Sequence, residues 1–338
     1  MQVSVIIPTS RRCEQLERTL RSLVQHDWPS DEYEITVVEN GPRDDTSTLV
    51  EAIASRFKRK SIKYIYEPIP GLLAGRHRGA IEAKAEICAF LDDDVRVNAE
   101  WLPAIQEAFR DPQVALAGGP STPIFAITPP SWLSAFYQEN EQGRYCTWLS
   151  LLDGGTNIKE IDAGYVFGLN FIIRKKALFD CRGFHPDCLP KPLQRFQGDG
   201  ETGLSMSVRD SGLKALYHPA ASVGHEVPRS RLTIRYFRQR AFYQGVCDSY
   251  TKIRQEGNAH KTQTSWYHRL VEKFWMGQIK KTNGLPYPNV MRNTDQAYRS
   301  GFAFHQNEVH KDARLLDWVL RRTYFDRFLP EGWETLSK

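Results

Sequence analysis

Short apolar runs alternate with amphipathic segments through the first hundred residues of the chain. Four apolar runs have the length of buried strands, and polar residues follow each of them: residues 3–7, 35–38, 62–66 and 87–91. After the first run, Leu16, Leu20 and Leu23 recur at the spacing of one helix face. Strands and helices that alternate in this way predict an α/β fold, in which a parallel sheet is flanked by helical crossovers.

The last of these runs is followed directly by three carboxylates, Asp92, Asp93 and Asp94. Ligands of α/β proteins collect at the carboxyl ends of the strands, so the acids lie where a site is expected. Adjacent acids repel one another unless a cation lies among them, and hard divalent ions prefer carboxylate oxygens. The alternative interpretation is a solvated acidic loop that binds nothing.

Polar residues or proline also follow the other three strands. They are Pro8, Thr9 and Arg11 after the first strand, Glu39 and Asn40 after the second, and Arg76 in the helix after the third. An amide can bind a base edge, arginines bind phosphate, and a metal ion held by the acids would bridge a diphosphate. No glycine-rich phosphate loop of the G-x-x-x-x-G-K-[ST] or G-x-G-x-x-G type follows any of these four strands. This rim therefore predicts a site for a nucleotide diphosphate held by metal and arginine.

The chain resembles the inverting family-two glycosyltransferases of GT-A fold in four successive segments. They are V-S-V-I-I-P-T from residue 3, V-V-E-N-G-P-R-D-D-T from residue 37, G-L-L-A-G-R-H-R-G from residue 71 and F-L-D-D-D from residue 90. The resemblance implies a Rossmann-like, mostly parallel sheet. It also implies a D-x-D motif with Asp94 on the metal and Asp92 and Asp93 near the ribose or sugar. Family members usually have V-D-D-G-S at the second segment, so Glu39 and Asn40 leave the base identity open.

We expect a GT-A domain over residues 1–228 and a mostly helical C-terminal region over residues 229–338. Within the first domain, residues 1–118 would bind the nucleotide and residues 119–228 would carry the acceptor and catalytic groups.

The middle of the chain contains aromatic residues and one asparagine that are candidates for sugar binding. Residues 120–160 show no sustained period, and long irregular segments are usually functional. Trp132 and Trp148 could pack on an acceptor sugar, or could simply belong to the core. Asn170 lies in an apolar run, residues 165–174, that we expect to be a strand. By resemblance to a G-x-N segment of the family, Asn170 would bind a sugar hydroxyl, with satisfaction of the backbone as the alternative.

A general base is expected near residue 201, just before a helix that is predicted to begin near Thr202. Inverting glycosyl transfer needs a carboxylate that deprotonates the acceptor hydroxyl. The family usually shows G-E-D-x-[DE]-L here, with the second acid as base. Alignment on Leu204 gives Glu201 the base position and puts Gly200 where the first acid would be. We predict Glu201 as the base and Asp199 as its competitor, while helix capping would explain one of these acids without catalysis.

His225 is the candidate for a second metal ligand. It lies in a P-x-A-x-x-x-H context that, by resemblance, completes the metal shell with Asp94. Imidazole together with carboxylate suits Mn²⁺ or Mg²⁺. The alternative is a histidine with a purely structural role.

Composition and cysteine spacing indicate the cellular compartment and the class of partner. Hydrophobic residues make up 41% of the 338 residues and charged residues 25%, as in ordinary folded proteins, and the net charge of +5 does not indicate a nucleic-acid partner. Six scattered cysteines without a C-x-x-C pair, and no apolar leader or membrane-spanning run, predict a cytoplasmic protein. Arg231, Arg235 and Arg238 are expected to share one helix face. That face would allow peripheral contact with the inner face of the cell membrane or with diphosphate, or would simply be solvated.

These observations together predict a metal-dependent inverting glycosyltransferase. It would move a sugar from a nucleotide-sugar donor, with UDP-sugars favoured, to a glycan, glycolipid or small-molecule acceptor in polysaccharide or glycoconjugate synthesis. One alternative is a nucleotidyltransferase that makes a sugar nucleotide, although residues 8–12 lack the glycine- and lysine-rich loop usual for that class. The other is an inactive sugar-nucleotide-binding module, which the altered acids at Glu39, Asn40 and Gly200 allow.

Overall fold

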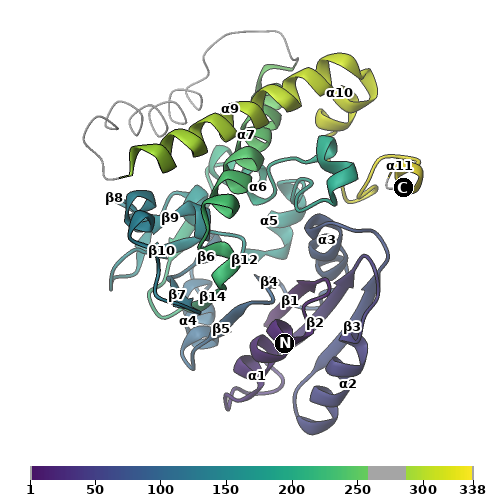
Figure 1. The fold of residues 1–338 in the computed structure, drawn as a ribbon. Coiled ribbons are helices and arrows are strands. Elements are labelled where there is room, and N and C mark those ends of the chain that lie inside the picture. The colour runs from purple at the N-terminus through teal and green to yellow at the C-terminus, as the bar shows by residue number, and fades with distance from the viewer. Residues whose placement is uncertain (1, 258–286, 337–338) are drawn as a thin grey trace.

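The structure is a computed structural model that describes residues 2–257 and 287–336, and it contains two β-sheets (Figure 1). The larger sheet has the strand order β11-β13-β6-β12-β4-β1-β2-β3. Its strands are β1 (Val3–Thr9), β2 (Tyr33–Asn40), β3 (Ile62–Glu67), β4 (Ile87–Leu91), β6 (Val114–Gly118), β11 (Lys159–Glu160), β12 (Asn170–Arg174) and β13 (Lys214–Tyr217). The smaller sheet, in the order β5-β14-β7-β10-β9-β8, consists of β5 (Val95–Val97), β7 (Ser121–Phe125), β8 (Gln138–Asn140), β9 (Gly143–Cys146), β10 (Leu151–Asp153) and β14 (Val223–Val227).

The strands of the first hundred residues form the parallel part of the larger sheet. β1 lies between β2 and β4 and runs parallel to both, and β3 is parallel to β2. The register sets Thr9 beside Glu39, so the carboxyl ends of these strands lie at one edge. β12 runs antiparallel between β4 and β6, and β6 pairs in parallel with β13. The predicted α/β fold with a mostly parallel sheet is confirmed.

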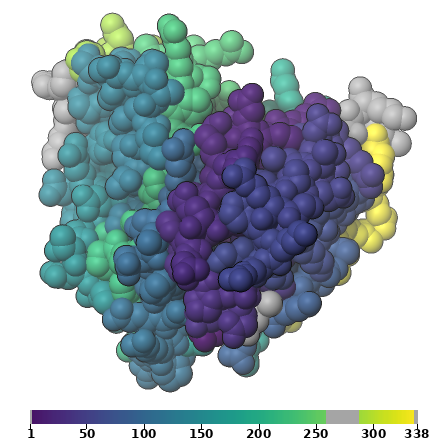
Figure 2. All heavy atoms as spheres, turned by 90° about the horizontal axis from the view of Figure 1, so that it is seen from below, coloured from purple at the N-terminus to yellow at the C-terminus, as the bar shows by residue number. Residues whose placement is uncertain are grey.

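Helices cover both faces of the larger sheet. Successive residues of a strand point to opposite faces, and accordingly Val5 and Ile7 of β1 belong to one core and Ile6 to the other. The first core packs α1 (Cys13–Val24), α2 (Thr46–Arg56) and α4 (Trp101–Ala108) on the sheet. The second packs α3 (Leu72–Glu82), α5 (Lys175–Asp180) and α6 (Glu201–Asp210) on it. Figure 2 shows a face on which the N-terminal residues, in purple and dark blue, lie against the middle of the chain, in lighter blue and teal.

The C-terminal part adds α7 (Ile234–Glu256), α9 (Pro288–Lys311), α10 (Ala313–Val319) and α11 (Trp333–Leu336). α7 and α9 pack along each other, and their backbones approach closely at Gly245 and Gly301. This part is joined to the rest of the molecule through polar contacts as well. The Trp318 indole donates to the Phe196 carbonyl at 3.1 Å, and the Thr251 hydroxyl of α7 donates to Asp199 at 2.6 Å. The described helices confirm a helical C-terminal region.

Three local expectations were wrong. Residues 120–160 are not irregular throughout, because β7 to β10 lie there, but these strands are too short to give a detectable period. The strand expected from residue 165 begins only at Asn170, after a 3₁₀ turn at Ala163–Tyr165. Arg231 does not share a helix face with Arg235 and Arg238, since it lies in the 3₁₀ turn Arg229–Arg231. Thr233 caps α7 by accepting the Tyr236 N–H, and so fixes the start of that helix beyond Arg231.

No helix in residues 2–257 and 287–336 is both long and apolar enough to cross a membrane.

Candidate active site

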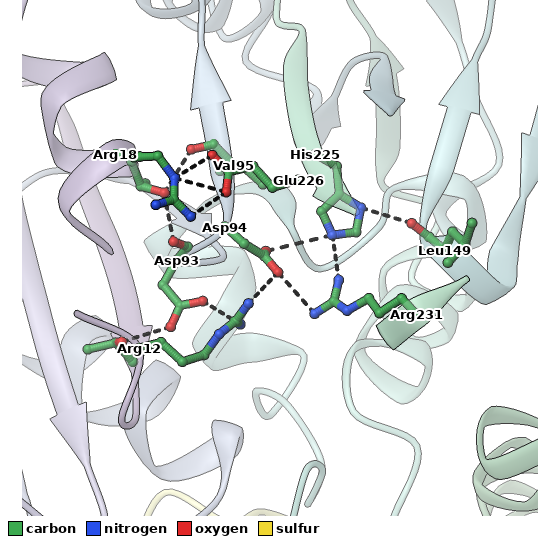
Figure 3. A network of polar contacts seen from close by, with 11 residues as sticks. Arg12, Arg18, Asp93, Asp94, Val95, Leu149, His225, Glu226 and Arg231 are labelled. Atoms are coloured by element: carbon green, nitrogen blue, oxygen red, sulfur yellow. Dashed lines mark hydrogen bonds and ion pairs between the residues drawn. The ribbon is translucent and has the colours of Figure 1, made fainter. Parts of the chain in front are cut away.

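Strand pairing in the smaller sheet brings the acid triplet to His225. Asp94 lies between β4 and β5, and the register of β5 with β14 sets His225 opposite Val95. His225 Nε2 consequently lies 3.7 Å from Asp94 Oδ1, although the two residues are far apart in the sequence. Glu226, the next residue of β14, accepts from Arg18 of α1 at 2.7 Å and ties that helix to the same region (Figure 3).

Two arginines balance the charge of the triplet. Arg12 contacts Asp93 at 2.5 Å and Asp94 at 2.7 Å, and Arg231 contacts Asp94 at 2.9 Å from the opposite side (Figure 3). Burial raises the pKa of Asp93 to about 7, against the opposing effect of Arg12. Burial also disfavours the charge on Asp94, but His225, Arg231 and Arg12 outweigh it and hold the pKa of Asp94 well below its usual range. Asp94 is therefore the strongly anionic member of the triplet.

The arrangement of Asp94 and His225 fits a divalent metal ion. The His225 Nδ1–H donates to the Leu149 carbonyl at 2.9 Å, so Nε2 carries the lone pair that a metal ligand requires. Here Nε2 accepts from Arg231 Nη1 at 2.7 Å and lies 3.7 Å from Asp94 Oδ1 (Figure 3). A metal ion bound to Nε2 would take the place of this arginine contact. Asp94 Oδ1 is buried and has no hydrogen-bond partner. Within the described ranges no cluster of three or more His, Cys, Asp or Glu side chains could hold a metal. An ion bound by this pair would need its other ligands from substrate or water.

A second cluster is centred on the buried Arg76 of α3. Its guanidinium lies 3.3 Å from Glu201 Oε2 and 3.7 Å from Asp92 Oδ1, and it donates to the Gly168 carbonyl at 3.1 Å. The Gly168 N–H in turn donates to Glu201 Oε1 at 3.1 Å. Burial raises the pKa of Asp92, and Arg76 opposes that rise. Arg76 thus connects the end of β4 with the start of α6.

Glu201 also lies on the wall of a cavity of about 300 Å³. Much of the remaining lining is aromatic or apolar: Tyr145, Trp148, Tyr165, Val166, Phe167 and Met206. Residues of α6 and α7 close it on other sides. Aromatic faces can pack on a sugar ring, and the Glu201 carboxylate in the wall can accept the proton of a bound hydroxyl.

The model of the glycosyl transferase family 2 matches residues 4–180. The chain belongs to this family. Glycosyltransferase AglE of Haloferax volcanii is 30% identical over 117 residues, which are 35% of this chain and 38% of AglE. The validoxylamine A glucosyltransferase of Streptomyces hygroscopicus subsp. jinggangensis is 30% identical over 33% of this chain and 26% of its own. Both alignments thus cover less than two thirds of these relatives. The succinoglycan biosynthesis protein ExoM of Rhizobium meliloti is 24% identical over 79% of each chain.

Solved structures of similar fold extend over most of the chain. The mannosyltransferase PcManGT of Pyrobaculum calidifontis, in complex with GDP-Man and Mn²⁺, covers 96% of this chain and 88% of its own, with a TM-score of 0.53 and 15% identity. Residues 1–349 of TarS from S. aureus, in complex with UDP-GlcNAc, cover 91% of this chain and 92% of their own, with a TM-score of 0.50 and 15% identity. At this identity the likeness concerns the fold.

Within this family 2 fold, the two candidate bases face different surroundings. Asp199 is buried and both of its oxygens are engaged, one with His185 Nδ1 at 2.6 Å and the other with the Thr251 hydroxyl at 2.6 Å. Glu201 is the first residue of α6 and its side chain is 32% exposed. Asp199 therefore ties α7 to the loop before α6, whereas Glu201 reaches the cavity.

Asp187 is a member of the Arg76 cluster that the sequence reasoning missed. Its Oδ2 lies 3.5 Å from Arg76 Nη1, while its Oδ1 is buried without a hydrogen-bond partner. Burial raises the pKa of Asp187 to about 7. Gly200 has a φ of +58°, and a Cβ on it would lie 2.9 Å from Asp187 Oδ2. The carboxylate of Asp187 thus lies beside the position where the family's usual motif has its first acid.

The nucleotide-binding candidates lie together at the carboxyl ends of β1 and β2. Thr9 donates to Asp93 at 2.7 Å, and Pro8 precedes it in β1. Glu39 is buried and accepts the Asp44 N–H at 2.7 Å, and the amide of Asn40 donates to the Gly71 carbonyl at 2.8 Å. A carboxylate oxygen of Glu39 and the amide nitrogen of Asn40 are thus already hydrogen-bonded to the backbone of neighbouring loops. Arg11 is exposed with a φ of 55°.

The three candidate sugar ligands of the middle segment lie in different places. Asn170 is 3% exposed, accepts from the Trp101 indole at 3.0 Å and donates to the Ala221 carbonyl at 2.8 Å, so its side chain is held inside the sheet. Trp148 lines the cavity and stacks on Phe237 at 5.9 Å between ring centroids. Trp132 packs edge-on against Phe237 and does not line this cavity.

Arg12 and Arg231 are the other residues that sequence reasoning missed at this site. Arg12 directly follows Arg11, the residue predicted for the rim, and Arg231 was expected on a helix face. No motif marks either of them. Arg231 lies six positions after His225, and this proximity to a candidate ligand was the only available signal.

Proposed function

We propose that this family 2 member is a metal-dependent inverting glycosyltransferase that uses a nucleotide-sugar donor, with UDP-sugars favoured. One observation carries the proposal: Arg76 joins Asp92 of the D-x-D segment to Glu201, and Glu201 lines an aromatic cavity. A donor bound at the rim and an acceptor in the cavity would then meet at the Glu201 carboxylate. The acceptor is a glycan, a glycolipid or a small molecule.

The donor would be bound by residues of the first half of the domain, 1–118. The rim residues proposed for this role are Pro8, Thr9, Arg11, Glu39, Asn40, Asp92 and Asp93, with Arg76 behind the acids. Asn170 is left out of this set, because its side-chain amide is already engaged with Trp101 and Ala221. PcManGT with GDP-Man and TarS with UDP-GlcNAc are glycosyltransferases of similar fold that bind nucleotide sugars, which supports a donor of this class.

Glu201 acts as general base in this proposal. Its carboxylate accepts the proton of the acceptor hydroxyl while the hydroxyl oxygen attacks the anomeric carbon from the face opposite the diphosphate, and this inverts the configuration. Arg76 and the Gly168 N–H fix the orientation of the carboxylate. Asp94 and His225 would hold Mn²⁺ or Mg²⁺, which supplies positive charge for the departing diphosphate. The Mn²⁺ in the PcManGT complex supports a divalent ion.

The acceptor half would comprise residues 119–228, and the helical region 229–338 would complete the cavity. Arg240, Gln244 and Asp248 of α7 line that cavity and support this division. A role in polysaccharide or glycoconjugate synthesis is supported by the name of the succinoglycan biosynthesis protein ExoM.

A thermal-shift screen of UDP-, GDP- and dTDP-sugars, each with and without Mn²⁺, tests the proposal. We expect one base to stabilise the protein only in the presence of metal, and slow donor hydrolysis with the same pair. If no nucleotide sugar stabilises the protein or is hydrolysed, the proposal fails. Pyrophosphate release from a nucleoside triphosphate and a sugar phosphate would instead identify a nucleotidyltransferase.

A further inference from the structure

Arg240 of α7 is a cation without a counter-ion in the cavity that contains Glu201. Its guanidinium makes no hydrogen bond or ion pair with any side chain or carbonyl in residues 2–257 and 287–336. Other arginines of the protein interior are engaged, Arg76 with carboxylates and Arg254 with the Val319 and Arg321 carbonyls. Burial disfavours the charge on Arg240, but Tyr236, Cys188, Cys247 and Glu201 outweigh it and raise its pKa. Arg240 therefore remains positively charged at the cavity wall.

The carboxylates that share this cavity are already satisfied. Glu201 accepts from Arg76 and from the Gly168 N–H. Asp248 accepts from the Gln244 amide and from the Tyr298 hydroxyl, each at 2.8 Å. Asp248 is eight residues beyond Arg240 in α7, so the Cα atoms of the two residues are about 12 Å apart along the helix axis.

Asp162 is the remaining acid that lines the cavity. Its Oδ1 accepts the Gly164 N–H at 2.8 Å, and its Oδ2 lies 3.8 Å from Arg209. None of the three acids therefore depends on Arg240, and the charge of Arg240 is available to a ligand.

We propose that Arg240 binds a phosphate group carried by the acceptor. This inference rests on the proposed function, because it takes the cavity beyond Glu201 as the acceptor site. Arginine binds phosphate oxygens through its planar, forked N–H groups. The hydroxyls of Thr202 and Ser205 line the same cavity and can donate to further phosphate oxygens.

The position of Arg240 favours the acceptor over the donor diphosphate. The cavity is lined by none of the rim residues at the carboxyl ends of β1 and β2, by none of the acid triplet and not by His225. Glu201 is the point at which the two regions meet. A phosphate on Arg240 would thus lie on the acceptor side of the proposed base.

Binding of inorganic phosphate to the chain of residues 1–338 tests the inference. Sodium phosphate is titrated against sodium chloride of equal ionic strength, with and without a saturating nucleoside diphosphate and Mn²⁺, and the melting temperature is recorded. We expect phosphate to stabilise the nucleotide-saturated wild type. Arg240→Gln should weaken this response about tenfold or more, because a hydrogen-bonded charge partner is lost. Arg299→Gln is the matched control, since it removes an arginine that is exposed on α9.

Three outcomes would overturn the inference. Wild type could show no phosphate response, Arg240→Gln could respond as wild type does, or the response could vanish when the nucleoside diphosphate is bound. The last outcome would assign Arg240 to the donor. Arg240→Lys keeps the buried charge and is measured in parallel. If Arg240→Gln does not fold, the phosphate response of the lysine variant still tests the role of Arg240. If no nucleotide binds, the proposed function is refuted. The phosphate titration without nucleotide would still show whether Arg240 binds phosphate.

Discussion

Glu201 and Asp199 are two residues apart, and their different surroundings allow the candidate bases to be tested separately. Glu201→Gln should lower the transfer rate by about 10²- to 10⁴-fold, because the proton acceptor is lost. The nucleotide affinity should change little, since the rim is untouched. Transfer assays and calorimetric nucleotide titration measure the two effects.

The matched control is Asp199→Asn. It should lower the free energy of unfolding by about 1–3 kcal/mol, because it weakens the buried contact with His185. Transfer by the folded protein should persist. If Asp199→Asn instead abolishes transfer in a fully folded protein, Asp199 is the base and the assignment of Glu201 is wrong.

Asp187 should make stability depend on pH in a predictable direction. Its pKa in the folded protein is about 7, whereas an unfolded aspartate titrates near 3.9. Between these values a rising pH ionises the carboxyl more readily in the unfolded chain, so the folded state loses stability. Asp187→Asn does not titrate, and its melting temperature relative to wild type should therefore rise as the pH is raised from about 4 to about 7. A constant difference across this range would contradict the burial argument.

The sequence predicted some residues of the candidate site far better than others. Asp92, Asp94, Glu201 and His225 lie in local motifs, and the structure brings these four to one region of the fold. Asp187 carries no such motif, because it approaches Gly200 only through the folding of the loop before α6. A contact that depends on tertiary structure, like those of Arg12 and Arg231 with Asp94, leaves no pattern in the local sequence.

At the level of elements, the long and regular ones were predictable and the short ones were not. β1 and β4 are fully buried apolar runs, and the leucine stripe of α1 has a clear helical spacing. β8 and β10 have three residues each, too few to show an alternation. The start of α7 was missed because a threonine cap, not a change of hydrophobic pattern, sets it.

The crossing of α7 and α9 gives a test at this scale. Alanine usually stabilises a helix relative to glycine by about 1 kcal/mol. At Gly301, however, a Cβ would overlap the backbone of Phe242, which cannot move without the whole helix. Gly301→Ala should therefore lower the free energy of unfolding by about 1–3 kcal/mol, as overpacking does.

Chemical denaturation measures this effect. Ser300→Ala, at the exposed neighbouring position, is the control and should stay within about 0.5 kcal/mol of wild type. An unchanged unfolding midpoint for Gly301→Ala would mean that the two helices do not approach as closely as described.

For the whole molecule, Asp94 is the point at which distant parts of the chain converge. Arg12 reaches it from the end of β1, while His225 and Arg231 reach it from β14 and the turn that follows. The larger and the smaller sheet are thereby connected through one carboxylate. A metal and nucleotide bound here would interact with both parts, and a ligand that binds only the folded state stabilises it.

This arrangement predicts how metal and nucleotide act together on stability. In wild type, Mn²⁺ and a nucleoside diphosphate together should raise the melting temperature more than the sum of their separate effects, because the diphosphate supplies ligands that Asp94 and His225 alone cannot. His225→Ala should remove most of this excess, since it deletes the imidazole nitrogen that lies 3.7 Å from Asp94 Oδ1. The control is His218→Ala, a buried histidine that faces Glu107 at 3.4 Å and lies away from the acids. It should lower the baseline stability but keep the excess. If His225→Ala retains the full excess, the metal is held elsewhere, and the convergence on Asp94 serves only to join the two sheets.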